Sequence, residues 1–320
     1  MDCDKNCSIC FGCDITGFCG GLTPGDGETL AQLADFGRGF SRKLLPNLPI
    51  GRTCACLRAV LLGKFLRTAP DIPCWIDRDR FVVEANKLLA ILPWSYLAGF
   101  PIQLDDIIGG AKNILKDFDF RPLGMELAMK PSLVRAVEVA ILHKKMTTSL
   151  QRSGVPCLSK VLGLAGVIPN NNPMVAESLQ LAADAELDNL ILISEIDAAD
   201  DSPCIPISEL RAIGFSVEEI EKDDVQTVYK KLLHARINGQ RQPKIIIVRN
   251  QSAQIFEISP ATISDESTTA DFFIPDTIHN YFALLNMRKN SDYDNWQYRF
   301  ECAVDFHPEI LQFVEGIRAH

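Results

Sequence analysis

Apolar residues recur at spacings of three and four in several segments of the chain, which is the pattern of amphipathic helices. These segments lie at 29–45, 56–67, 130–145, 173–187, 207–214 and 223–239. Pro131 and Pro173 stand in first turns, where a missing N–H costs nothing, and Gly214 closes another segment. The segment 77–92 begins extended at 81–83 and then takes the same helical spacing. The pattern therefore predicts a helix in each of these segments.

Short runs with strand character alternate with these helices in the second half of the chain. They lie at 159–166, 189–197, 215–221 and 243–250. Most are apolar throughout, which indicates strands that are buried on both faces. Alternating strands and helices of this kind favour a parallel sheet covered by helices on both sides. We therefore expect an α/β fold that is doubly wound, with a mostly parallel sheet.

The two ends of the chain depart from this pattern. Residues 1–27 are rich in Cys and Gly and show little hydrophobic periodicity. Beyond about residue 256 the sequence becomes rich in Ser, Thr and Asp, and apolar residues return near the C-terminus. We expect a Cys/Gly-rich segment at 1–27, one α/β domain at 28–255, and a linker and C-terminal tail with a short helix at 256–320.

The composition of the chain argues against several classes of function. The chain is 47% hydrophobic, enough for a large core, and its net charge of −9 argues against nucleic acid as a partner. No apolar run reaches the roughly eighteen residues that a membrane span needs. The N-terminus, MDCDKNCSIC, lacks the basic and apolar regions of a secretory signal. We expect a cytoplasmic protein that binds neither membranes nor nucleic acids.

Cysteines gather at the N-terminus. Of the eleven in the chain, Cys3, Cys7, Cys10, Cys13 and Cys19 fall within the first twenty residues. In a chain without a secretory signal, clustered thiols indicate metal or redox chemistry more than a disulfide framework. The first four could bind Zn²⁺ or an iron–sulfur cluster, or the segment could be a flexible reduced tail.

Two strand ends are the expected places for ligands, because parallel sheets bind them outside the carboxyl ends of their strands. One end is GLAGVIPNNN after 159–166, where we expect the asparagines to cap the following helix. The other is ISEIDAADDSP, whose Asp197, Asp200 and Asp201 form either a solvated loop or a weak divalent-metal site. A Gly-Asp-Gly-Glu string at 25–28 lacks a preceding strand, and we interpret it as a turn.

Three stretches of sequence resemble one enzyme family. They are ELDNLILISEID at 186–197, the block at 212–248 from AIGFSVEE to KIIIV, and FLRTAPDIPCWIDRDRFVV at 65–83. Together with the helix at 130–145, they are similar to the thiamine-diphosphate domain of transketolases over roughly 28–252. The resemblance implies the thiamine-diphosphate-binding fold, with thiamine diphosphate and Mg²⁺ as the family cofactor.

The resemblance also implies where that cofactor would sit. In the family, the Asp of a Gly-Asp-Gly loop and an Asn after the next strand hold Mg²⁺, which holds the diphosphate. Counting back from 187–189 without gaps places the loop on Gly166, Val167 and Ile168 and the Asn on Asp197. An aliphatic Val167 thus replaces the metal carboxylate, and a bulky Ile168 lies where backbone should approach phosphate. We expect these to be degenerate cofactor positions.

Other family features are missing as well. The family's two histidine motifs fall near Asn47 and near 86–87, where this sequence has no histidine. Only about seventy residues follow the similarity, too few for the pyrimidine-binding and C-terminal domains that the resemblance implies.

We therefore expect a transketolase-like protein that is a pseudoenzyme, without a catalytic residue or a bound cofactor. It would act as a binding or regulatory module that self-associates as a dimer or pairs with a transketolase-type chain. The alternative is the N-terminal subunit of a split transketolase, a transferase of ketol groups completed by a partner chain. A third class, a metal or redox protein that uses the N-terminal cysteines, also stays open.

Overall fold

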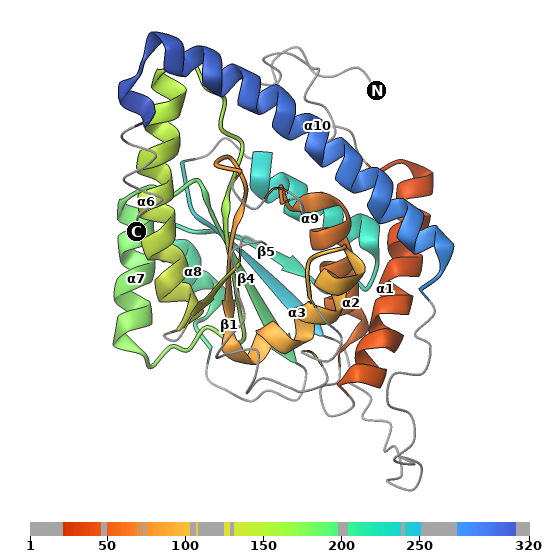
Figure 1. Cartoon of the computed structure of the whole chain (residues 1–320). Helices are drawn as coiled ribbons and strands as arrows, with labels where there is room; N and C mark the ends of the chain where they lie inside the picture. The colour runs from red at the N-terminus through yellow and green to blue at the C-terminus, as the bar shows by residue number, and fades with distance from the viewer. Residues whose placement is uncertain are drawn as a thin grey trace, which may run out of the picture.

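Six strands form one parallel sheet in the computed structural model (Figure 1). The structure describes residues 22–45, 50–68, 70, 72, 75–102, 107, 125–128, 131–197, 204–237, 241–250 and 274–311. The strands are β1 (Arg80–Glu84), β2 (Met125–Ala128), β3 (Val161–Ala165), β4 (Leu190–Asp197), β5 (Ser216–Ile220) and β6 (Lys244–Asn250). Their spatial order is β2-β1-β3-β4-β6-β5, and every neighbouring pair is parallel. The doubly wound fold expected from the sequence is confirmed.

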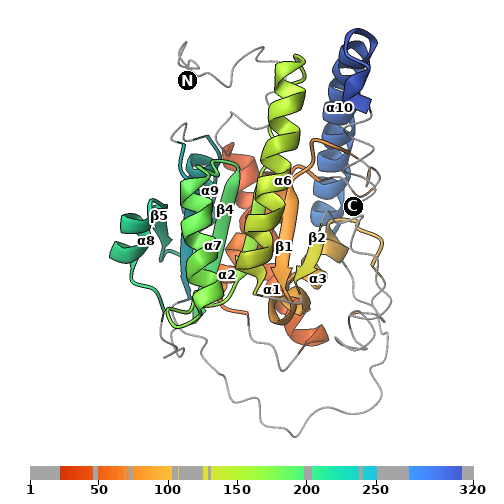
Figure 2. The same cartoon turned by 90° about the vertical axis from the view of Figure 1, so that its left-hand side faces the viewer.

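Helices cover both faces of this sheet. One layer contains α1 (Pro24–Leu44), α2 (Arg52–Val60), the π-helix η1 (Leu61–Phe65), α3 (Ala85–Leu97) and α9 (Val225–Ile237). The other contains α6 (Ser132–Arg152), α7 (Pro173–Asp184) and α8 (Ile207–Ile213), of which α6 and α7 face the viewer in Figure 2. In β1, Phe81 and Val83 join the core of the first layer and Val82 joins that of the second. The strands are thus buried on both faces, as their apolar sequences predict.

Two glycines are required by the geometry. A Cβ on Gly163 of β3 would lie 2.8 Å from the Cβ of Ala136, so the glycine lets α6 pack closely on the sheet. Gly214 ends α8 with φ +118°, a left-handed conformation that side chains disfavour. The sequence prediction that Gly214 closes this helix is therefore confirmed.

A long helix near the C-terminus was not predicted from the sequence. Helix α10 (Asp276–Phe306) has 31 residues and runs from beside α1 to the end of α6 (Figure 1). Its first half buries Ile278 and Phe282 in the main core, and its second half buries Trp296 and Phe300 against α6. Part of the stretch expected to be a linker and tail therefore packs on the α/β domain.

Two smaller differences concern the N-terminal helix and the sheet edge. The Gly-Asp-Gly string at 25–27, interpreted as a turn, lies instead in the first turn of α1, where Thr23 accepts a hydrogen bond from the Asp26 N–H. Strand β2 had no strand signal that we recognised. Within the part of the chain that the structure describes, no helix is long and apolar enough to cross a membrane.

Candidate functional site at the carboxyl edge of the sheet

Strand order reverses between β1 and β3, and this reversal defines the candidate site. The chain passes from β1 to β2 on one side and then returns to place β3 on the other side of β1. In open α/β sheets the crevice at such a switch point, outside the carboxyl ends of the strands, is the usual ligand site. Val83 and Leu164 are in register, so Glu84 at the end of β1 lies beside the loop that begins at Gly166.

The loop at 166–168 is held by contacts within the protein. The Gly166 N–H donates to Glu84 Oε2 at 3.0 Å, and the Gly166 carbonyl accepts from Ser194 Oγ at 2.8 Å. Ile168 is 5% exposed in the second core, and its carbonyl accepts the Ile205 N–H at 3.0 Å. The predicted cofactor loop is therefore fixed by its own hydrogen bonds and by one buried side chain.

Charged side chains fill the space beside this loop. A Cβ added to Gly166 would lie 3.6 Å from Glu84 Oε2 and 3.7 Å from Lys87 Cε. The Lys87 ammonium lies 3.4 Å from Glu195 Oε2 of β4, and Arg58 of α2 lies 2.8 Å from Glu195 Oε1. The Arg58 and Glu195 side chains are each only 2% exposed. At the switch point, Glu195 thus lies between two cations, the buried Arg58 and the partly exposed Lys87.

The cations determine the ionisation of the buried carboxylate. Burial alone would raise the pKa of Glu195, but Arg58 and then Lys87 hold that pKa below its usual range. Arg58 is further fixed by donating to the carbonyls of Ala90 at 3.0 Å and Cys54 at 2.9 Å. Glu195 is therefore an anion whose two oxygens already face cations of the protein.

The structure brings only part of the predicted site together. Gly166, the half-buried Val167 and the buried Ile168 form one loop, and Asp197 ends β4 opposite Asn250 of β6. The Asp197 side chain lies outside the described part of the structure. So do Asp200, Asp201 and the predicted metal ligands, which are Cys3, Cys7, Cys10 and Cys13. One local prediction is confirmed, because Asn172 caps α7 by accepting the Met174 N–H at 3.1 Å.

Sequence analysis missed Glu84, Lys87 and Glu195 as members of this site. A signal was present, because Glu195 closely follows the apolar run 190–193 of a strand predicted to be buried, and a buried carboxylate needs a partner. The partner, Arg58, lies 137 residues away in sequence. Only the tertiary structure could identify it.

These residues do not fit a magnesium diphosphate. Mg²⁺ needs oxygen ligands, and Val167, which the sequence resemblance places at the position of the family's carboxylate, has no side-chain oxygen. A diphosphate needs N–H donors or cations, but the Gly166 N–H is taken by Glu84, and Lys87 by Glu195. Among the residues that the structure describes, no three His, Cys, Asp or Glu side chains gather as a metal site.

A second charged network lies at the opposite, amino edge of the sheet, just before β1 and β3. Asp79 accepts the N–H groups of Arg67 at 2.9 Å and Lys160 at 2.7 Å, and it pairs with Arg236 of α9. Asp77 pairs with Arg67 at 3.0 Å and accepts the Ser159 N–H at 3.0 Å. Both carboxylates are almost fully buried. They tie four chain segments together where the strands begin.

The amino edge also contains a histidine beside a serine and an aspartate, which is not a catalytic triad. Asn189 Nδ2 lies 3.2 Å from His143 Nδ1, and since an amide nitrogen only donates, Nδ1 accepts and Nε2 carries the hydrogen. His143 Nε2 therefore donates to Ser159 Oγ at 3.0 Å, which donates to Asp77 at 2.7 Å. Burial, and then Arg80, lowers the His143 pKa to about 3. The proton order is the reverse of an activated serine, so the array is structural.

Comparisons with known proteins point to one family. No protein-family model matches the sequence. The transketolase of Physarum polycephalum is 23% identical to this chain, in a match that covers 90% of this chain and 50% of the relative. The transketolase of Bacillus subtilis is 22% identical, and the match covers 84% of this chain and 45% of the relative. The structure of a transketolase from Leishmania mexicana superposes with a TM-score of 0.70 at 18% identity, covering 88% of this chain and 48% of its own. The structure of a transketolase from Campylobacter jejuni superposes with a TM-score of 0.68 at 21% identity, covering 88% of this chain and 49% of the other. The chain spans about half the length of these relatives.

Proposed function

This chain carries a partial transketolase-family domain, and from the residues at its switch point we propose that it is a transketolase-like module without catalytic activity. Its role would be to bind or regulate a protein partner, either a second copy of itself or a transketolase-type chain. A cytoplasmic location and a metal site at the N-terminal cysteines stay predictions from the sequence.

One observation carries this proposal, which is the composition of the switch point between β1 and β3. An aliphatic Val167 lies where the family's metal carboxylate belongs, and Glu84 accepts the Gly166 N–H that lies beside it. Lys87 approaches Glu195 from the same side. The protein's own charges thus satisfy each other there, and a coenzyme would have to break these contacts.

The described histidines support the same conclusion, because none of them lies at this carboxyl edge. His143 is buried at the amino edge, and His234 of α9 contacts Glu218 of β5. His279 and His307 belong to α10 and its C-terminal end. No imidazole among them can exchange a proton with a substrate at the switch point.

Isothermal titration with thiamine diphosphate and Mg²⁺ tests this proposal. We expect no heat of binding and no rise in melting temperature with this chain, while an active transketolase under the same conditions serves as the positive control. Binding at micromolar strength, about −8 kcal/mol, would refute the loss of the cofactor.

A second function is favoured by the half-length match. A separate chain carrying the other half of a transketolase would complete the enzyme, and this chain would then be one subunit of it. The test is co-purification with identification of the bound chain, followed by a ketol-transfer assay on the complex. Activity of the complex supports the split enzyme. A stable complex that lacks activity favours the regulatory module.

A further inference from the structure

A cavity of about 200 Å³ lies under α10 at the amino edge of the sheet, far from the switch point. Its lining comes from the segment before β1, the loop before β3 and one face of α10. The lining residues are Arg67, Asp77, Pro156, Leu158, Asp292, Asn295, Trp296 and Arg299. At about 30 Å³ for each water, this space equals roughly seven water molecules, which is the size of a small metabolite.

Two of the four charged groups in this lining already neutralise each other. Arg67 Nη2 lies 3.0 Å from Asp77 Oδ2, and both side chains are almost fully buried. Asp77 also accepts the N–H groups of Leu158 and Ser159, each at 3.0 Å. These groups form a rigid, electrically neutral wall.

The other two charges, Asp292 and Arg299, come from α10 and do not pair with each other. They are seven positions apart, about 10 Å along a helix axis at 1.5 Å per residue. Within the described part of the chain, neither forms an ion pair shorter than 4 Å, although the buried Lys289 lies near Asp292. Burial raises the pKa of Asp292 even with Arg67 and Lys289 nearby, so its charge is under-compensated.

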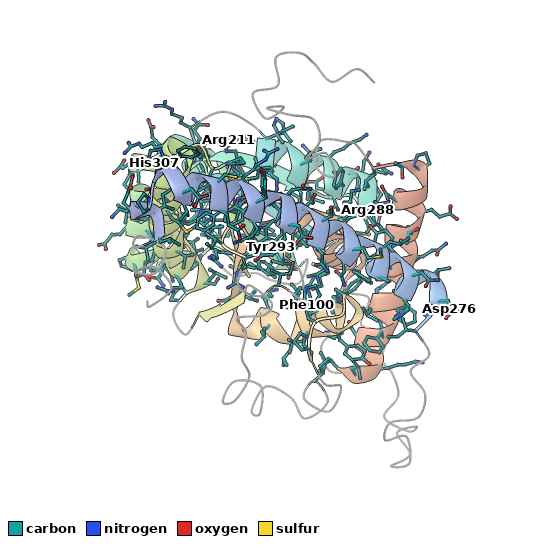
Figure 3. All side chains as sticks on the ribbon, turned by 45° about the horizontal axis from the view of Figure 1, so that its top comes forward. Phe100, Arg211, Asp276, Arg288, Tyr293 and His307 are labelled. Atoms are coloured by element: carbon teal, nitrogen blue, oxygen red, sulfur yellow. The ribbon has the colours of Figure 1, made fainter. Side chains whose placement is uncertain are left out.

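The wall between these two charges is apolar and fixed. Trp296 is 4% exposed, and its indole N–H donates to the Pro156 carbonyl at 2.9 Å. Its ring stacks on Phe300 at 5.2 Å. Pro156 and Leu158 complete this apolar surface. Figure 3 looks onto α10, on which Arg288 and Tyr293 are labelled.

We propose that this cavity binds a small zwitterion, an α-amino acid with an aliphatic side chain. Its ammonium group would face Asp292, its carboxylate would face Arg299 and Asn295, and its side chain would lie on Trp296. A zwitterion fits because its ammonium can approach Asp292 and its carboxylate can approach Arg299 without adding net charge to the cavity. A simple anion or cation would contact only one of these two groups and would add net charge.

Calorimetric titration of the full chain with alanine, valine and leucine tests this inference. At least one should bind, and its N-acetyl and amide derivatives, like acetate and methylamine, should bind at least about tenfold more weakly. Arg299→Gln and Asp292→Asn should each weaken binding by the same factor, because each removes one counter-charge. Arg288→Gln and Asp294→Asn, exposed on α10 outside the lining, are the matched controls and should leave the affinity unchanged.

Three results would overturn the proposal: no binding of any of the three amino acids, acetate binding as tightly as they do, or equal loss of affinity in Arg288→Gln. Circular dichroism of Arg299→Gln shows whether the variant is folded, which its exposed position leads us to expect. Because the cavity is separate from the switch point, a negative result for amino-acid binding would leave the proposed function unchanged.

Discussion

Several charged side chains of this protein are buried away from water. Lys289 is an example, since it lies on the buried side of α10 and is only 6% exposed. Burial lowers its pKa to about 8, even though the carboxylates of Asp79 and Asp292 act in the opposite direction. Its ammonium group therefore costs stability at neutral pH.

Replacing Lys289 by methionine should increase stability at pH 7. The folded pKa of about 8 is below the unfolded value of about 10.4, so between them the unfolded chain binds more protons. The loss of folding free energy caused by the buried lysine is therefore largest below pH 8 and disappears as the pH rises toward 10. We expect Lys289→Met to gain about 1–3 kcal/mol at pH 7 in urea unfolding, with the gain shrinking toward pH 10.

Lys230→Met, at an exposed position on α9, controls for the loss of a positive charge and should show no such pH trend. A Lys289→Met protein that is less stable than the wild type at pH 7 would mean that the amine has a stabilising partner.

At the scale of elements, α10 shows how side-chain contacts hold a surface helix on the domain. About half of its residues are apolar, and the buried ones recur at helical spacings that the sequence analysis did not recognise. Three side chains also donate to backbone carbonyls across the domain. Tyr281 reaches Gly63 at 2.7 Å, and Asn286 reaches Ala98 at 3.3 Å. With the Trp296 bond to Pro156, they fix the helix along its length.

Trp296→Ala should therefore detach the C-terminal half of α10. Removing a buried tryptophan leaves a cavity and costs about 3–5 kcal/mol. Chemical unfolding gives the loss, and amide hydrogen exchange should show faster exchange in α10 than in the sheet. Tyr298→Ala, 69% exposed two residues further on, should change stability by less than about 0.5 kcal/mol. Equal effects of the two variants would contradict the observed packing of Trp296.

At the scale of the whole molecule, buried ion pairs tie the helical layers to both edges of the sheet. Arg236 of α9 meets Asp79 at the amino edge, and Arg58 of α2 meets Glu195 near the carboxyl edge. All four side chains are at most 6% exposed. Breaking one such pair leaves an uncompensated charge in the interior.

Glu195→Gln should therefore reduce stability by about 3–5 kcal/mol, because Arg58 and Lys87 would lose their counter-charge. Urea unfolding at neutral pH measures this loss. Asp223→Asn is the matched control, since its ion pair with Arg52 is more than half exposed and should contribute less than about 1 kcal/mol. If the two variants lost equal stability, the buried pair would have no special role.

The sequence by itself determined the fold class and most of the element boundaries. The ranges 189–197 and 243–250 contain the uninterrupted apolar runs 190–193 and 245–248, which are typical of a strand covered on both faces. Local rules also placed Asn172 as a cap and Gly214 as a helix end, because these depend on a few neighbouring residues. That Val167 replaces the family's metal carboxylate stays a prediction, because it rests only on a register of positions counted along the sequence.

Only the tertiary structure decided how charges were paired. The contact of Arg58 with Glu195 joins residues far apart in sequence, and so does that of Arg236 with Asp79. Whether a buried charge is neutralised depends on three-dimensional proximity, which no local pattern encodes. The same holds for the position of α10, because its hydrogen bonds join it to segments that are far away in sequence.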